Sequence, residues 1–209
     1  MSVKKDLQQK VDIMKKKKAL KRSNLFNAAY ELFVTKGINN TAIDDIVKKA
    51  GVAKGTFYLY FKDKYDIVDK IILEKSAYII EEAFEKTESR KEEFPNFIDN
   101  IIFFIDYIIE YLKDNKLILK FLYKNLSRSM YKNNFLNNEK NVRLKTLVDG
   151  FILNLKENNY TEDEAKKILF IIVELTSSIC YSSIILEDPD TIDNMKPELL
   201  KAIRKILNK

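Results

Sequence analysis

The chain of 209 residues contains no histidine, no tryptophan and a single cysteine. Without histidine, the commonest general base and metal ligand is missing, and no CxxC pair, GxSxG motif or glycine-rich phosphate loop is present. Cys180 cannot form a disulfide within the chain, which fits a reducing compartment such as the cytoplasm. It lies in an apolar run that is typical of a small buried side chain rather than a nucleophile. These absences predict a protein that is not an enzyme and that uses no cofactor or metal.

Glycine and proline are also scarce, with four and three residues. So few chain breakers, together with many leucines, isoleucines, lysines and glutamates, favour helix. No segment shows the alternating apolar pattern of a strand. We therefore expect an all-α protein.

The positive charge is concentrated at the N-terminal end. Residues 1–64 hold fifteen Lys or Arg against six Asp or Glu, whereas the remainder holds twenty-two against twenty-five. The net charge is therefore +9 in the first segment and −3 in the rest. This asymmetry indicates that the first third meets a polyanion, either nucleic acid or an anionic membrane, although a solvated lysine-rich tail has the same composition.

Three short helices are predicted over residues 24–36, 41–50 and 54–61. Gly37 ends the first, Thr41 and Asp44 resemble a capping box for the second, and Gly51 provides a tight link to the third. This order is typical of a helix-turn-helix. Because any three-helix bundle has a similar periodicity, the pattern alone leaves DNA binding open. The expected buried anchors are Ile46, Val47, Ala50, Phe57 and Phe61.

The rest of the chain is predicted to be a second, larger helical body. Asp63 can cap a helix over residues 64–88, and Thr161 with Glu164 forms a capping box. We predict a basic extension (1–22), a helix-turn-helix domain (23–66) and a helical domain (67–209). Helices in the body are expected over 97–112, 115–132, 137–157, 161–186 and 197–207.

Residues 168–186 form an apolar segment with one charge, Glu174. Its length is close to that of a membrane span. Five serines and threonines would be costly in lipid, and no second span accompanies it. We therefore favour a helix buried between its own domain and a second subunit, with no membrane partner.

Three sequence blocks resemble the DNA-binding domain of the TetR family of bacterial regulators. They are AAYELFVTKG (28–37), TAIDDIVKKAGV (41–52) and KGTFYLYFKDK (54–64). The resemblance covers about a fifth of the chain, from Asn24 to about Val68. It implies a DNA-binding function, with seven residues at the contact surface: Thr41, Lys54, Gly55, Thr56, Tyr58, Tyr60 and Lys64. Ala53 departs from the family pattern, in which a serine is frequent, and so lacks a side-chain cap.

The resemblance also implies a homodimer and a small-molecule effector. The dimer interface is expected to be a four-helix bundle made by the helices over 137–157 and 161–186 of both copies. An effector would shift helix 64–88 and change the separation of the DNA-reading helices. The expected interface residues are Leu175, Ser178, Ser182 and Ile185. A lipophilic effector pocket is one interpretation of Phe103, Phe104, Tyr107, Tyr111, Phe121 and Tyr123, and a solid core is the other.

The basic run from Lys15 to Arg22 lies outside the resembling segment. We expect it to fray in the absence of an anionic partner, because like charges repel. We also expect it to contact the DNA backbone or the minor groove through Lys17, Lys18, Lys21 and Arg22.

Together these features predict a cytoplasmic, ligand-responsive transcriptional regulator, favoured as a repressor. It would bind a palindromic double-stranded DNA operator as a dimer and be released by a small lipophilic effector. The alternative is a helical adaptor of TetR-like fold that acts through protein contacts without specific DNA binding. Attachment to a membrane surface through residues 1–22 is a third hypothesis for the function.

Overall fold

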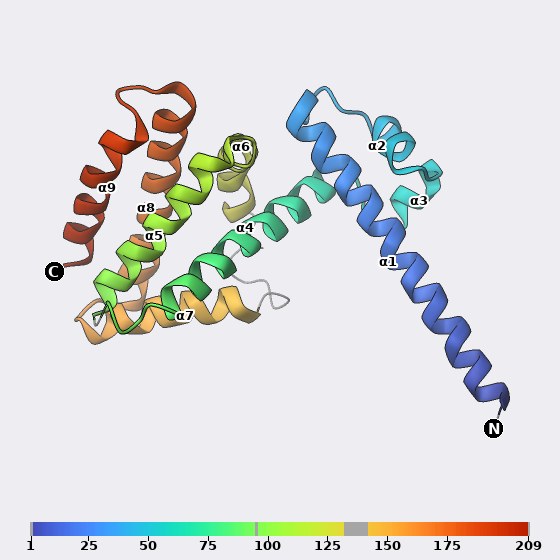
Figure 1. Cartoon of the computed structure of the whole chain (residues 1–209), viewed down its shortest axis with the longest axis horizontal. Coiled ribbons are helices and arrows are strands. Elements are labelled where there is room, and N and C mark those ends of the chain that lie inside the picture. Colours follow the sequence, from blue (N-terminus) through green and yellow to red (C-terminus); the bar gives the residue numbers. More distant parts are fainter. Residues whose placement is uncertain (1, 95, 132–141, 209) are drawn as a thin grey trace. The chain divides into compact units, whose positions relative to one another are not determined.

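The computed structural model describes residues 2–94, 96–131 and 142–208, and in that part of the chain every regular element is a helix (Figure 1). The predicted all-α class is confirmed. The helices are α1 (Ser2–Lys36), α2 (Ile43–Ala50), α3 (Lys54–Tyr58), α4 (Lys64–Glu88), α5 (Phe97–Asp114), α6 (Lys116–Tyr131), α7 (Val142–Glu157), α8 (Glu162–Tyr181), a π-helical turn (Ser182–Leu186) and α9 (Ile192–Leu207).

The chain divides into two units, Met1–Ile71 and Ile72–Lys209. The division falls inside α4, which contributes residues to both. The first unit holds the helix-turn-helix and the second holds the larger helical body.

The core of the first unit forms where the C-terminal half of α1 packs against α2. The buried residues of α1 recur at spacings of three and four, so they form one face of that helix. Helix α3 and the segment after it add two buried rings, and the start of α4 adds further buried residues. The main buried residues are Leu25, Ala29, Leu32, Phe33, Ile46, Phe57, Phe61, Ile67 and Ile71.

Helix α1 is longer than expected. The basic run that we expected to fray is part of one continuous helix of 35 residues, so that expectation was wrong. No glycine or proline interrupts residues 2–36, and lysine, leucine and glutamine are good helix formers. The segment from Leu25 onward is fixed by packing, and helix then extends from it at the gain of one hydrogen bond per residue.

The second unit pairs α5 with α9 through charged side chains. Arg204 lies 2.6 Å from Asp99, and the ammonium of Lys196 lies 2.8 Å from Asp106 and 2.5 Å from Glu110. Lys113 forms a further ion pair with Asp193. The residue numbers fall on α9 as they rise on α5, so the two helices run antiparallel.

Helix α8 packs against α5, α6, α7 and α9. Its predicted capping box is confirmed, because Thr161 accepts from the N–H of Glu164 and Glu164 accepts from the N–H of Thr161. After Tyr181 the helix widens into the π-helical turn, which ends at Glu187 in a left-handed conformation with φ 56°.

Two helix boundaries differ from the prediction. Helix α9 begins at Ile192, where Asp190 accepts from the N–H of Thr191, and Pro197 lies inside the helix rather than at its start. Helix α3 ends at Tyr58. The first residues of the helix expected over 137–157 lie outside the described residues, and α7 is described from Val142.

Candidate nucleic-acid interface

The turn between α2 and α3 is built around Gly51. This residue has φ 66°, and its N–H donates to the carbonyl of Lys48 at 3.3 Å. The N–H of Val52 donates to the carbonyl of Val47 at 3.0 Å, which closes the end of α2. Glycine adopts this left-handed conformation at little cost, so the chain reverses sharply here.

Helix α3 is anchored from below by two aromatic rings. Phe57 and Phe61 are buried, as predicted, and their ring centroids lie 5.4 Å apart. Phe57 also meets the ring of Tyr58 edge-on at 5.4 Å. These contacts fix the orientation of a helix of only five residues, which would be unstable by itself.

The opposite side of α3 faces solvent. Tyr58 is 53% exposed and Leu59 is 76% exposed, while Lys54 and Gly55 are also exposed. Thr56 and Tyr60 are half-buried. Four of the predicted contact residues, Lys54, Gly55, Thr56 and Tyr58, therefore lie on α3, and Tyr60 lies just after it. Ala53 caps the helix without a side-chain hydrogen bond, as expected.

Lys54 has a partner that the sequence analysis did not assign. Its ammonium lies 2.8 Å from the carboxylate of Asp44 on α2, and both side chains are largely exposed. The hydrogen bond to Asp44 and the attraction between the charges raise the pKa of Lys54 above its usual value. The carboxylate of Asp44 thus holds the ammonium of Lys54, the first residue of α3, close to α2.

The loop between α1 and α2 is held by two of the predicted contact residues. The predicted Thr41–Asp44 capping box was wrong: Ala42 is the N-cap of α2, and its N–H donates to Asp45 at 3.1 Å. The buried hydroxyl of Thr41 donates to the carbonyl of Gly37 at 2.8 Å. Its phosphate contact stays a prediction.

Lys64 also turns inward rather than offering a free charge. Its ammonium donates to the carbonyls of Ile38 at 2.8 Å and Thr41 at 3.0 Å. The residue therefore ties the start of α4 to the loop before α2. Asp63 caps α4 as predicted, accepting from the N–H groups of Tyr65 and Asp66.

Lys70 supports the end of α3. It donates to the carbonyl of Tyr60 at 3.3 Å and to Asp66 at 2.9 Å, and it lies 5.0 Å from the ring centroid of Phe61. Burial pushes the pKa of Asp66 upward, but the bonds from Lys70 and from the N–H of Lys62 outweigh it and lower the pKa. Nothing in the sequence pattern singled out Lys70.

The basic extension presents its charges to solvent. Every side chain described from Val11 to Asn24 is exposed, including the four predicted contact residues Lys17, Lys18, Lys21 and Arg22.

In the second unit the six residues predicted for an effector pocket separate into different contacts. Phe103 stacks on Phe94 and Tyr123 stacks on Tyr181. Phe121 is buried, whereas Phe104, Tyr107 and Tyr111 are half-buried.

A polar cluster forms around Tyr107. Its hydroxyl donates to Glu82 Oε1 at 2.8 Å, and burial with this bond raises the pKa of Tyr107 to about 12. The other oxygen of Glu82, Oε2, is buried without a hydrogen-bond partner. Tyr78 and Tyr111 pack beside each other, with centroids 6.4 Å apart. The cluster therefore contains a carboxylate oxygen that could accept a donor from outside the chain.

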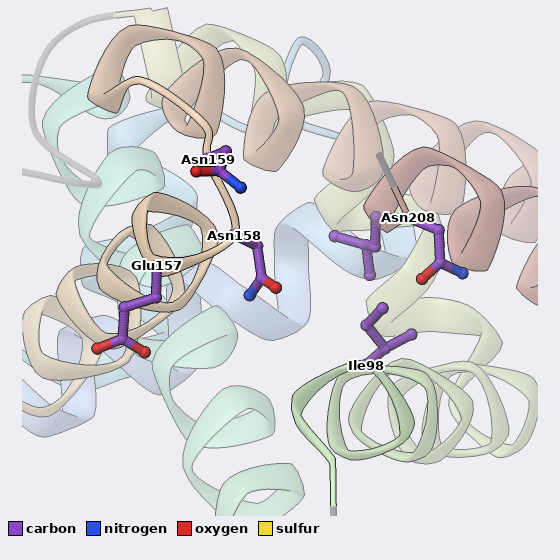
Figure 2. A pocket seen from close by; sticks show the side chains of 6 residues that line it. Ile98, Glu157, Asn158, Asn159 and Asn208 are labelled. Atoms are coloured by element: carbon purple, nitrogen blue, oxygen red, sulfur yellow. The ribbon is translucent and has the colours of Figure 1, made fainter.

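A separate hollow lies at another place in this unit. Figure 2 shows Ile98 at the start of α5, Glu157 at the end of α7 with Asn158 and Asn159 just after it, and Asn208 after α9. None of the six predicted pocket residues lines it. In the part of the chain that the structure describes, no cluster of three or more His, Cys, Asp or Glu side chains could hold a metal ion.

The predicted dimer residues share one row on α8 and the π-helical turn. Leu175, Ser178, Ser182 and Ile185 follow one another at spacings of three and four, and Ile171 extends the row. None of them is buried, and Ile171 is 49% exposed. The buried row of the same helix lies elsewhere, at Ala165, Ile172, Thr176, Cys180 and Ser183.

The segment Glu162–Leu186 is long and apolar enough to cross a membrane by length and composition. Its buried row packs against other helices of the same unit.

Residues 25–71 match the family model of bacterial regulatory proteins of the tetR family. The chain is 37% identical over 75 residues to the fatty acid metabolism regulator protein of Bacillus subtilis, a match that covers 36% of this chain and only 39% of that relative. It is 27% identical over 183 residues to an HTH-type transcriptional regulator of Haemophilus influenzae, covering 86% and 89% of the two chains.

The fold also matches the crystal structure of Thermus thermophilus FadR, a TetR-family transcriptional repressor in complex with lauroyl-CoA. The TM-score is 0.58 at 18% sequence identity, and the match covers 89% of this chain and 92% of that one. At this identity the likeness concerns the fold.

Proposed function

Because this chain belongs to the TetR family of bacterial regulatory proteins, we propose that it is a cytoplasmic transcriptional repressor that reads a palindromic operator as a homodimer. The observation that carries this proposal is the exposure of Lys54 and Tyr58, beside the half-buried Thr56, on a helix anchored by Phe57 and Phe61. A rigid helix of this kind enters the major groove, where its side chains reach base edges.

Selection of bound sequences from random double-stranded DNA tests the proposal. The expected result is an inverted repeat whose half-sites are separated by about one helical turn or a multiple of it. A Tyr58→Ala variant should lose preference for the selected sequence while keeping its weaker binding to unrelated DNA, because phosphate contacts remain. If the wild-type protein enriches no sequence, the chain is better described as a helical adaptor that acts through protein contacts.

The proposed dimer uses the row of α8 and the π-helical turn that runs from Ile171 to Ile185, in which Ile171 and Ser178 are exposed and the others are half-buried. This row contains apolar residues, Ile171, Leu175 and Ile185, interrupted by small serines that permit close approach of a second helix. Leu153 on α7, which packs beside α8, is also exposed. Covering such an apolar surface with the same surface of a second copy satisfies the symmetry of a two-fold dimer.

Sedimentation of an Ile171→Glu variant tests this interface. A charge placed in an apolar interface should shift the protein toward monomer and weaken operator binding. Leu117→Glu is the matched control, because Leu117 is equally large and exposed but lies on α6. If both variants sediment as the wild type does, the interface is elsewhere.

The proposed effector is lipophilic with a polar end. Two relatives are named for fatty acid metabolism or solved with lauroyl-CoA, which supports an apolar body. The unpartnered Glu82 Oε2 favours a polar end that donates hydrogen bonds, such as an amine, over the anionic phosphates of an acyl-CoA. Since α4 carries Glu82 and also belongs to the first unit, an effector that shifts α4 would weaken operator binding.

Release of the selected operator by lauroyl-CoA and by a long-chain alkylammonium ion, followed by fluorescence anisotropy, separates the two polar ends. The ammonium compound should release DNA, and Glu82→Gln should weaken its effect about tenfold, the loss of one charge-assisted hydrogen bond. Glu88→Gln, on the exposed end of α4, should respond like the wild type. If lauroyl-CoA releases the operator and Glu82→Gln does not change this release, the effector has an anionic polar end and does not bind through Glu82.

A further inference from the structure

The N-terminal part of α1 carries a charged surface that the family match does not include. The match begins at residue 25, whereas α1 begins at Ser2. Residues 1–22 contain nine Lys or Arg and two Asp, a net charge of +7. Figure 1 shows this half of α1 running on beyond α2 and α3 within the first unit.

The basic side chains have a fixed direction because the helix is continuous. Lys18 and Arg22 are followed by Leu25, Ala29 and Leu32 at spacings of four, three, four and three. Residues at these spacings lie on one face of a helix. The last three are buried where α1 packs against α2. Lys18 and Arg22 therefore lie on the same side of α1 as the residues that pack against α2.

Lys16 lies on the other side of the same helix. It shares a row with Leu20, Ser23, Asn27 and Glu31, at spacings of four, three, four and four, and all five are exposed. This row faces solvent in the extension and also further along α1, where the opposite side of the helix packs against α2. The extension thus offers two lysines, Lys16 and Lys18, of equal charge and exposure on different faces.

We propose that the face of α1 formed by Lys17, Lys18, Lys21 and Arg22, here called the basic face, binds the phosphate backbone of DNA flanking the operator half-site. The inference rests on the proposed DNA-binding function and adds a second contact surface to it. Residues 15–22 span about 12 Å of helix, which is long enough to meet several phosphates. The contact is electrostatic, so it contributes affinity without reading sequence.

The distribution of apolar residues favours DNA over a membrane surface. A helix that lies in a membrane interface segregates its apolar side chains on one face. From Val11 to Asn24 the exposed large apolar residues are divided between two faces: Val11 and Met14 precede Lys18 on the basic face, whereas Ile13 and Leu20 lie in the row of Lys16. Among the side chains described from Val11 to Asn24, the apolar ones therefore do not gather on a face separate from the basic face.

Full-length Lys18→Gln and Lys16→Gln variants test the direction of the basic face, since each removes one charge from the same exposed helix. We expect Lys18→Gln to reduce the slope of log affinity against log salt by about 0.9, the value for one lost phosphate contact. Lys16→Gln should leave the slope unchanged. Equal slopes for the two variants would overturn the proposal.

A triple variant, Lys18→Gln/Lys21→Gln/Arg22→Gln, tests the location of the contact. The wild type should lose about tenfold in affinity when the selected operator is trimmed to its half-sites, whereas the triple variant should bind long and trimmed DNA equally. Circular dichroism confirms that α1 remains helical. If the triple variant still distinguishes the two DNAs, the flanking contact lies elsewhere and the proposal fails.

The outcome is separable from that of the proposed function. A wild-type protein that selects an operator, with no effect of the triple variant, rejects the basic face alone. A wild-type protein that selects no sequence rejects the proposed function. Co-sedimentation with anionic vesicles that depends on Lys18 but not Lys16, together with unchanged DNA binding, overturns the proposal in favour of a membrane surface.

Discussion

The two units of the chain place their polar side chains in opposite ways. In the first unit, Lys54 and Tyr58 stand on the outside of a helix that is anchored by buried rings. In the second unit, polar atoms lie inside. Among the described residues, five buried side-chain oxygens have no hydrogen-bond partner, and four of them belong to the second unit: Ser76, Glu82, Thr176 and Ser183.

Under the proposed function, this difference follows from what each unit would bind. The groove of DNA is always outside the protein, so a reading surface must be exposed, rigid and polar. A small effector is enclosed by the protein that binds it, so its polar contacts must be held within an apolar interior. Unpartnered buried oxygens are costly in a finished core, and their presence in the second unit is consistent with an internal ligand.

The largest expected effect is a loss of stability that is confined to the first unit. Phe57→Ala removes a fully buried ring from the first unit and should lower its free energy of unfolding by about 3–5 kcal/mol. Leu59→Ala, two residues away and mostly exposed, should change it by less than about 0.5 kcal/mol. Urea unfolding followed by circular dichroism measures both.

Cys180 reports on the second unit in the same experiment. Burial raises the pKa of its thiol to about 12, so a thiol reagent should label it only when the second unit opens. In Phe57→Ala the first unit should unfold while Cys180 stays unlabelled. Simultaneous labelling would mean that the two units unfold as one.

The next effect concerns the ion pair at the reading helix. Lys54→Gln should weaken operator binding about tenfold, because it removes a cation from the DNA surface. Asp44→Asn should act in the opposite direction, because it frees Lys54 and removes a negative charge that repels phosphate. Fluorescence anisotropy with labelled operator measures both. If Asp44→Asn weakens binding, then Asp44 positions Lys54 for the bound state.

Replacing a buried threonine by valine should change the free energy of unfolding differently in the two units. Thr41→Val removes a buried hydroxyl that donates to Gly37, so it should destabilise the first unit by about 1 kcal/mol. Thr176→Val removes a buried hydroxyl without a partner, so it should be neutral or stabilise the second unit by up to about 1 kcal/mol. Thermal unfolding of each variant tests the contrast. A destabilised Thr176→Val would show that this hydroxyl does have a partner in solution.

The smallest expected effect is a dependence on pH in the first unit. The pKa of Asp66 is lowered in the folded protein, so its bond with Lys70 contributes stability above the usual Asp pKa, and this is lost as the pH falls through the folded value. Below about pH 4 the wild type should therefore lose slightly more stability than Asp66→Asn, by less than about 1 kcal/mol. Urea midpoints at pH 7 and pH 3 measure the difference. Equal losses would remove Asp66 as a source of stability.

Much of the first unit could be predicted because its signals are local. Gly51 marks a turn, Asp63 marks a helix start, and the spacing of Phe57 and Phe61 marks a buried face. The row Leu175, Ser178, Ser182 and Ile185 was likewise visible as helical periodicity. Each of these inferences needs only neighbours within about one or two helical turns.

The polar partners could not be predicted in the same way. Lys64 meets Ile38, which lies 26 residues away, and Lys196 meets Glu110 across 86 residues. Which donor meets which acceptor depends on how the helices pack, and a long charged side chain has many acceptors within reach in an unfolded chain. Asp44 was assigned to a cap from its sequence position, whereas the packing of α3 against α2 turned it toward Lys54.

The sequence by itself determined the helices, the buried anchors of the helix-turn-helix and the concentration of positive charge before residue 23, because propensity, periodicity and composition act along the chain. Only the tertiary structure decided that Thr41 and Lys64 hold a loop and that Glu82 keeps one oxygen unpartnered. These features depend on burial and on distance in space, which the order of residues does not specify.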